Sequence, residues 1–207
     1  MTATTSKIER YGISQNSSET KIFGSRLNKI IKILYICFNK PLKQKTMTPN
    51  WLAILVAAFA TLPVGFIWYN KHVFGTVWMK ETGVTEESAK NANMLKIFGL
   101  TIFFSLMISF FLPTIVIHQV GALQLTGGDP ALALPSYQAF MNDYAHHHRS
   151  FGHGALHGAM AGIFLILPAI GINAQYEGKS WKYILINAGY FIVSLAIMGG
   201  ILCAWEN

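Results

Sequence analysis

Four long runs of apolar residues, almost free of charged side chains, alternate with shorter polar segments along the chain. The runs cover about residues 51–69, 97–117, 151–172 and 181–205. A helix needs about 20 mainly apolar residues to cross the hydrocarbon core of a bilayer. The pattern therefore predicts an all-α membrane protein in which four transmembrane helices form an up-down bundle.

Small residues recur at helical spacing in three of these runs, most regularly as a glycine zipper in the third. Residues four apart lie on one helix face, and small side chains there let a neighbouring helix approach closely. We therefore expect close helix packing along these faces, and a homo-oligomer if a second copy packs there. The helix-packing residues predicted in this way are Ala53, Ala57, Gly65, Gly154, Gly158, Gly162, Gly189 and Gly200.

Composition agrees with a membrane location. Hydrophobic residues make up 52% of the 207 residues and charged residues only 12%, against about 25% charged in soluble domains. The net charge of +7 comes mainly from residues 1–46, which hold nine of the sixteen Lys and Arg residues. Because the basic charge is confined to this arm, it does not indicate nucleic-acid binding.

The basic arm, residues 1–46, has two interpretations, and the sequence leaves both open. Leu27, Ile30, Ile31 and Leu34 recur at helical spacing between lysines, as in an amphipathic helix at a membrane interface. Alternatively, translation starts at Met47, directly before the membrane domain of residues 47–207. The positive-inside rule places both termini inside with the arm and outside without it, so the orientation also stays open.

Most histidines are expected at one membrane face. With four spans, the end of the second and the start of the third lie on the same side, together with the connection between them. His153 and His157 are four apart and share a helix face, so they can bind one metal ion, and imidazole suits zinc, copper, nickel or iron. If the long loop of residues 120–150 folds back, the ligands of a divalent transition metal come from His118, Asp143, His146, His147, His153 and His157.

Two other interpretations of these histidines remain. Histidine titrates near neutral pH, so the group could respond to protons. It could also be structural, with the helical histidines bonded to neighbouring groups and the His146–His148 run solvated.

No span contains a carboxylate, and no nucleophile is paired with a base, so the sequence favours a protein that is not an enzyme. Transporters more often carry a charge deep in the membrane, whereas the one charged residue of these runs, Lys182, stands at the very start of the fourth. Two hypotheses follow: a small multi-pass membrane protein without enzymatic activity, or a protein that binds metal or couples transport to metal ions or protons.

Both ends of the membrane domain are similar to one known family. PNWLAILVAAFATLPVGFIWYNKHVFGTVWMKETGVTEE, residues 49–87, and EGKSWKYILINAGYFIVSLAIMGGILCAW, residues 177–205, resemble the opening and closing segments of the bacterial membrane proteins catalogued as domain of unknown function 1761. The resemblance covers about residues 50–205, which leaves the arm outside the family pattern. It implies a small multi-pass protein of the cytoplasmic (inner) membrane. It implies no cofactor, ligand or catalytic residue.

Overall fold

The computed structural model describes residues 24–26, 28–29, 32 and 48–206. The chain divides into two compact units, Met1–Gln44 and Lys45–Asn207. The apolar positions of the predicted interfacial helix, Leu27, Ile30, Ile31 and Leu34, lie outside the described residues. The fold described below is that of the second unit.

The second unit contains four helical segments that are long and apolar enough to cross a bilayer, and the described part of the chain has no strand. The predicted all-α membrane fold is therefore confirmed, with span boundaries close to those expected. The segments are α2 and α3 (Trp51–Phe59 and Thr61–Trp68), α6 and α7 (Met94–Phe111 and Pro113–Val116), α10, η3 and α11 (Phe151–Ala161, Gly162–Ile166 and Leu167–Tyr176) and α12 (Trp181–Ala204).

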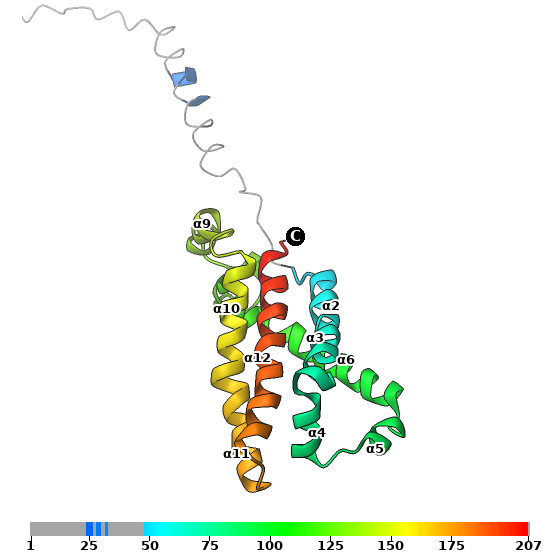
Figure 1. Ribbon diagram of the computed structural model, residues 1–207. Coiled ribbons are helices and arrows are strands. Elements are labelled where there is room, and N and C mark those ends of the chain that lie inside the picture. Colours follow the sequence, from blue (N-terminus) through cyan, green and yellow to red (C-terminus); the bar gives the residue numbers. More distant parts are fainter. Residues whose placement is uncertain (1–23, 27, 30–31, 33–47, 207) are drawn as a thin grey trace, which may run out of the picture. The chain divides into compact units, whose positions relative to one another are not determined.

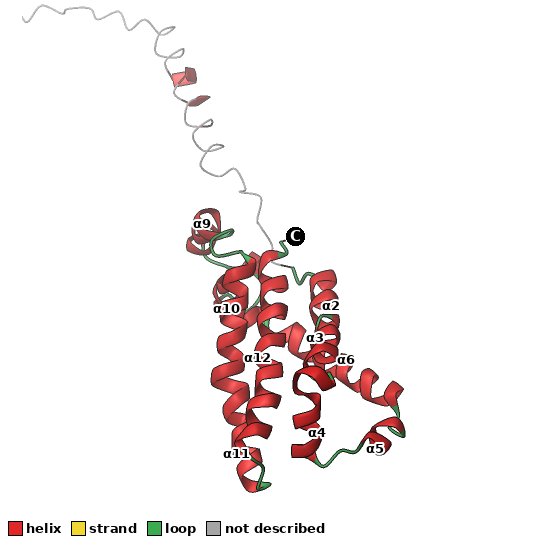
Figure 2. Cartoon of the chain, viewed as in Figure 1, coloured by secondary structure: helices red, strands yellow, loops and turns green. Residues whose placement is uncertain are grey.

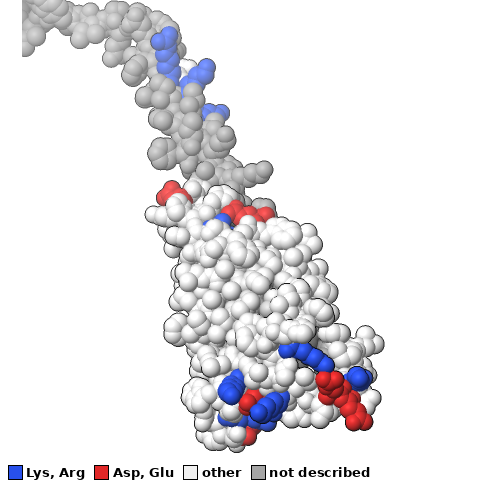
Figure 3. Space-filling model, in the orientation of Figure 1, with Lys and Arg blue, Asp and Glu red and all other residues white. Residues whose placement is uncertain are grey.

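The surface of this unit is suited to lipid. Large apolar side chains on all four spans face outward, and Phe66 is 79% exposed. On the face of this unit drawn in Figure 3, the charged side chains gather toward the two ends, with a broad uncharged belt between them. Exposed apolar area on this scale would be unfavourable in water, whereas lipid accommodates it.

Helices α10 and α12 run side by side in opposite directions, and α12 ends near the start of α2 (Figures 1 and 2). The seam between α10 and α12 follows the predicted glycine row. A Cβ atom added at Gly154 would meet the carbonyl oxygen of Gly199, and one added at Gly158 would lie 2.7 Å from the carbonyl carbon of Leu195. The glycines therefore allow the two backbones to touch, as small residues do between membrane helices.

The other predicted small residues also face neighbours within the chain. Gly200 lies under the ring of Phe151, Gly189 under that of Trp68, and Gly65 under that of Tyr190. The small-residue faces are thus covered by the chain's own helices. An oligomer would need other surfaces, and it stays a prediction.

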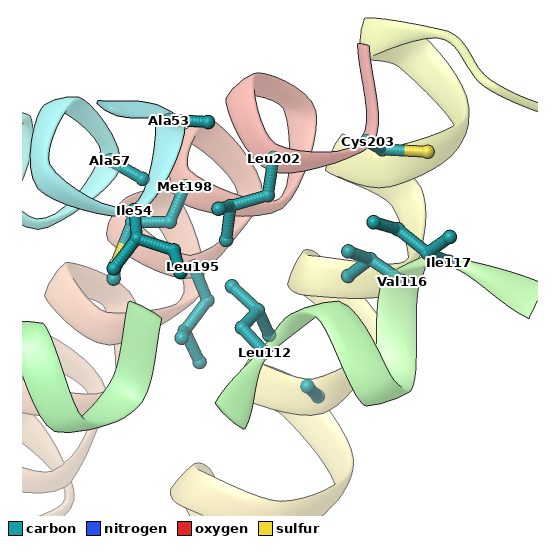
Figure 4. Packing of buried hydrophobic residues seen from close by; sticks show 11 residues of the cluster. Ala53, Ile54, Ala57, Leu112, Val116, Ile117, Leu195, Met198, Leu202 and Cys203 are labelled. Atoms are coloured by element: carbon teal, nitrogen blue, oxygen red, sulfur yellow. The ribbon is translucent and has the colours of Figure 1, made fainter. Parts of the chain in front are cut away.

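A buried apolar cluster joins α2, the end of α6, α7, α10 and α12. Figure 4 shows Ala53 and Ala57 of α2 beside Leu195, Met198 and Leu202 of α12; both alanines are fully buried. The small side chains of α2 therefore pack within the chain.

Two buried hydroxyl contacts connect α2–α3 to α6. Ser109 Oγ donates a hydrogen bond of 2.7 Å to the carbonyl oxygen of Ile54, and Thr61 Oγ1 lies 3.0 Å from Ser105 Oγ. These contacts give the buried hydroxyl groups hydrogen-bond partners inside the bundle.

The segments between the spans contain more helix than the sequence predicted. Residues 120–150 were predicted as a loop, but α8 (His118–Leu125), η2 (Pro130–Leu132) and α9 (Pro135–Tyr144) occupy much of it. The first span is followed by the π-helical turn η1 (Lys71–Gly75), α4 (Thr76–Thr82) and α5 (Glu86–Lys90). Pro130 and Pro135 each stand at the start of their helix, where a missing N–H costs nothing.

Candidate metal centre

The first turns of α10 place two imidazoles together. Ser150 caps the helix, because its hydroxyl accepts a hydrogen bond of 3.3 Å from the backbone N–H of His153. Gly154 and Gly158 hold one face of α10 against α12. His153 and His157 lie on the adjoining face, with their ring centroids 4.5 Å apart. The cap and the glycine row thus fix the start and the rotation of the helix that carries both rings.

His118 reaches these rings from the end of the second span. Its neighbour Gln119 is buried, and the Gln119 side-chain amide donates hydrogen bonds of 2.6 Å and 2.9 Å to the carbonyl oxygens of Tyr144 and His147. These bonds tie the start of α8 to the turn that leads into α10. They therefore hold His118 opposite His153.

The three histidines form a compact group of nitrogen donors, which we call the histidine triad: His118, His153 and His157. One ring nitrogen from each lies within 4.8 Å of the other two. His118 Nε2 and His153 Nε2 are 2.9 Å apart, close enough to share a hydrogen bond when one of them carries the proton. His118 is exposed and the other two are partly exposed, so solvent reaches the group.

A fourth imidazole stands beside the triad. The ring of His148 stacks on that of His153 at a centroid distance of 4.8 Å. His148 has a backbone φ of 61°, in the left-handed region where histidine is one of the enriched side chains. Its carbonyl oxygen accepts a hydrogen bond from Cys203 Sγ of α12. His148 is not among the ligands predicted from the sequence, where its place in the run of three histidines is the only signal.

The other predicted ligands lie outside the triad. His146 Nδ1 is 2.5 Å from Glu206 Oε2, just after α12, and the His147 ring lies against Tyr144. Asp143 is exposed near the end of α9. The His146–Glu206 contact puts the long connection and the C-terminal end of α12 on one side, as the count of four spans predicted.

The donor set of the triad suits a late first-row transition metal. Zinc binds imidazole nitrogen at about 2.0–2.1 Å, so two ligands of a tetrahedral site lie about 3.3 Å apart. The 2.9 Å separation of the two Nε2 atoms is slightly shorter than this value, and no separation within the triad exceeds 4.8 Å. Three imidazole nitrogens on one ion would leave the fourth position of a tetrahedral site open. No carboxylate belongs to the group among residues 48–206.

One of three comparisons with known proteins identifies a family for this chain. No curated protein and no solved structure matches the chain. A family profile described as "Protein of unknown function (DUF1761)" matches residues 52–203. This match includes all three triad histidines and most of each span. The chain, a four-span helical membrane protein with a histidine triad at one end of its bundle, belongs to the DUF1761 family.

Proposed function

We propose that this protein is a non-enzymatic membrane protein that binds a divalent transition metal ion at one membrane face. The observation that carries the proposal is the convergence of His118, His153 and His157, whose donor nitrogens lie within 4.8 Å of one another. His118 opens α8, directly after the second span, and the other two ligands lie in the third span. Metal binding would therefore link the end of the second span to the third.

The surroundings of the triad favour binding over catalysis. A three-histidine site with an open position resembles catalytic zinc sites. In the zinc proteases a glutamate beside the metal acts as the general base, and no carboxylate belongs to the triad among the described residues. The titratable side chain that contacts the triad there is another imidazole, His148, which offers a further nitrogen donor for an ion. We place the protein in the cytoplasmic membrane of a bacterium, on the resemblance of its first and last spans to bacterial family members.

Proton sensing is a second candidate function, and the 2.9 Å contact between His118 Nε2 and His153 Nε2 favours it. One shared proton stabilises this contact, whereas protonation of both rings would bring two N–H donors face to face. Acidic pH would therefore separate α8 from α10. Metal and protons would compete for the same nitrogens.

The test is zinc titration of the full chain, purified in detergent without a histidine tag. We expect one zinc ion per chain and a rise in melting temperature. Zinc at 100 times its Kd adds about 2.7 kcal/mol of stability, which corresponds to about 5–11 °C for a domain of this size. The double variant His153→Ala, His157→Ala should lose both the binding and the rise.

The matched control is the double variant His72→Ala, His147→Ala, which removes two histidines outside the triad. It should bind zinc as the unmodified chain does. Equal zinc affinity in both double variants would overturn the proposal, as would a melting temperature of the unmodified chain that does not respond to zinc. If zinc has no effect but His118→Ala abolishes a structural change between pH 5 and 8, proton sensing replaces metal binding.

A further inference from the structure

A cavity of about 300 Å³ lies at the end of the membrane domain where α2 begins and α12 ends. It is separate from the triad, since none of the three triad histidines lines it. Apolar side chains from α6, α8, α9 and α12 form most of its wall, among them Phe110, Leu123, Met141 and Leu202. Its volume is at the lower end of the range for sites that bind small molecules.

One strongly basic side chain, Arg149, is buried in this wall. Only 6% of the Arg149 side chain is exposed. One terminal nitrogen donates a hydrogen bond of 3.4 Å to the carbonyl oxygen of Trp205. Nε and the other terminal nitrogen, Nη1, are buried and have no hydrogen-bond partner among the residues that the structure describes.

The charge of Arg149 is only partly balanced within the described residues. Glu206 Oε1 lies 3.9 Å from Arg149 Nε, beyond hydrogen-bond distance, and the other oxygen of Glu206 already contacts His146 at 2.5 Å. A guanidinium is always charged, and a buried charge with unfilled donors is strongly unfavourable. The arginine therefore lacks an acceptor, and the cavity is where a ligand would supply one.

We propose that the cavity binds an amphiphile with an anionic oxygen head group, which accepts hydrogen bonds from Arg149 while its alkyl chain lies against Phe110, Met141 and Leu202. Carboxylate and phosphate oxygens match the planar donors of arginine. The cavity opens at the end of the spans, the level of lipid head groups, and Trp205 beside it is a side chain typical of that level.

The size of the cavity limits what it holds. Its volume corresponds to roughly ten groups of about 30 Å³, the volume of one water molecule in the liquid. An alkyl chain of about ten carbons fills such a space. A medium-chain fatty acid would therefore enter almost whole, whereas a longer fatty acid would leave the end of its chain, and an anionic phospholipid its second chain, in the bilayer. The inference does not rest on metal binding, because the two sites share no residue.

The test uses Trp205 as a reporter, with the full chain in nanodiscs of phosphatidylcholine and dibromostearate as a quencher. We expect a saturable quenching component that disappears in Trp205→Phe. Laurate should displace the probe, but dodecanol, which has the same chain and no charge, should not. Phosphatidylglycerol is tested as a second competitor. If laurate alone displaces the dibromostearate probe, the ligand is a fatty acid, whereas displacement by phosphatidylglycerol identifies a phospholipid head group.

Arg149→Met should raise the half-saturating probe concentration about tenfold, since it removes a charged hydrogen-bond donor. Lys96→Met, which removes a basic side chain in the first turn of α6, is the matched control and should leave it unchanged. The competition experiment uses the unmodified chain, so it decides the question even if Arg149→Met does not fold. Non-saturable quenching, or equal displacement by laurate and dodecanol, would overturn the proposal.

Discussion

Replacing Gly158 by alanine tests whether α10 and α12 pack with their backbones in contact. The added Cβ atom would lie 2.7 Å from the carbonyl carbon of Leu195, and real Cβ atoms essentially never come within 3.0 Å of another atom. The carbonyl oxygen of Leu195 would lie closer still, so reaching ordinary contact at 3.4 Å requires the helices to separate by more than about 0.7 Å. Such a gap loses at least about a quarter to a half of the dispersion energy of each contact at that level.

Overpacking of this kind costs about 1–3 kcal/mol. For a domain of this size each kcal/mol lowers the melting temperature by about 2–4 °C, so we expect a decrease of roughly 2–12 °C. The assay is thermal unfolding of the detergent-solubilised protein, followed by loss of the monodisperse species. Gly99→Ala is the matched control, because Gly99 lies inside α6 with nothing within 4 Å of an added Cβ atom.

Gly99→Ala should leave stability unchanged or raise it by up to about 1 kcal/mol, the usual gain on replacing a helical glycine. If Gly158→Ala melts at the same temperature as Gly99→Ala, then α10 and α12 do not pack with their backbones in contact. Chemical crosslinking of the same variants adds a second check. A dimer fraction that falls only in Gly158→Ala would mean that the glycine row contacts another copy of the chain.

Two further predictions concern hydrogen bonds and charge. Ser109→Ala removes the buried hydrogen bond to Ile54 and should lower the stability of the protein by about 0.6–1.7 kcal/mol. Thr101→Ala is the control, because the exposed Thr101 hydroxyl donates to the carbonyl oxygen of Ile97 within α6, and it should have a smaller effect in the same thermal assay. Equal effects of the two substitutions would contradict the role given to Ser109. The Lys71 ammonium, 2.6 Å from Glu86, lowers the pKa of that carboxyl below its ordinary value of 4.5 by a hydrogen bond and by charge attraction. The pair therefore stabilises the fold above pH 4.5, and this contribution is lost as the pH falls through the lowered value. Lys71→Met should return the pKa of Glu86 toward 4.5 in an NMR titration with ¹³C-labelled glutamate, and an unchanged pKa would exclude the pair in solution.

The sequence was sufficient to predict the spans because their pattern is strong. Uncharged runs of about 20 residues have few alternatives to a membrane helix. The row of Gly154, Gly158 and Gly162 also predicted a close helix contact, which the structure places between α10 and α12. The sequence could not show that α12 was the neighbour, because spacing along one helix says nothing about which helix it meets.

The candidate site was predictable only in part. The spacing of His153 and His157 follows from helical geometry, but the position of His118 depends on the tertiary hydrogen bonds of Gln119. The helix that carries Asp143, α9, ends at Tyr144, so His146 lies beyond it and meets Glu206 instead. The burial of Arg149 had no signal in the sequence, because an arginine in a polar loop is normally solvated.

The π-helical turn η3 changes how the third span must be understood. It adds one residue to a turn, since the N–H of Leu167 bonds to the carbonyl oxygen of Gly162, five positions back. Ala174 follows Gly162 by twelve positions, which an unbroken α-helix would rotate by about 120° away from it. With the extra residue the two align to within about 20°, and Ala174 is indeed buried. The buried face of the third span therefore follows one α-helical period before η3 and the same period, shifted by one residue, after it. A mutational scan that assumes a single period along the span would assign residues after η3 to the wrong face.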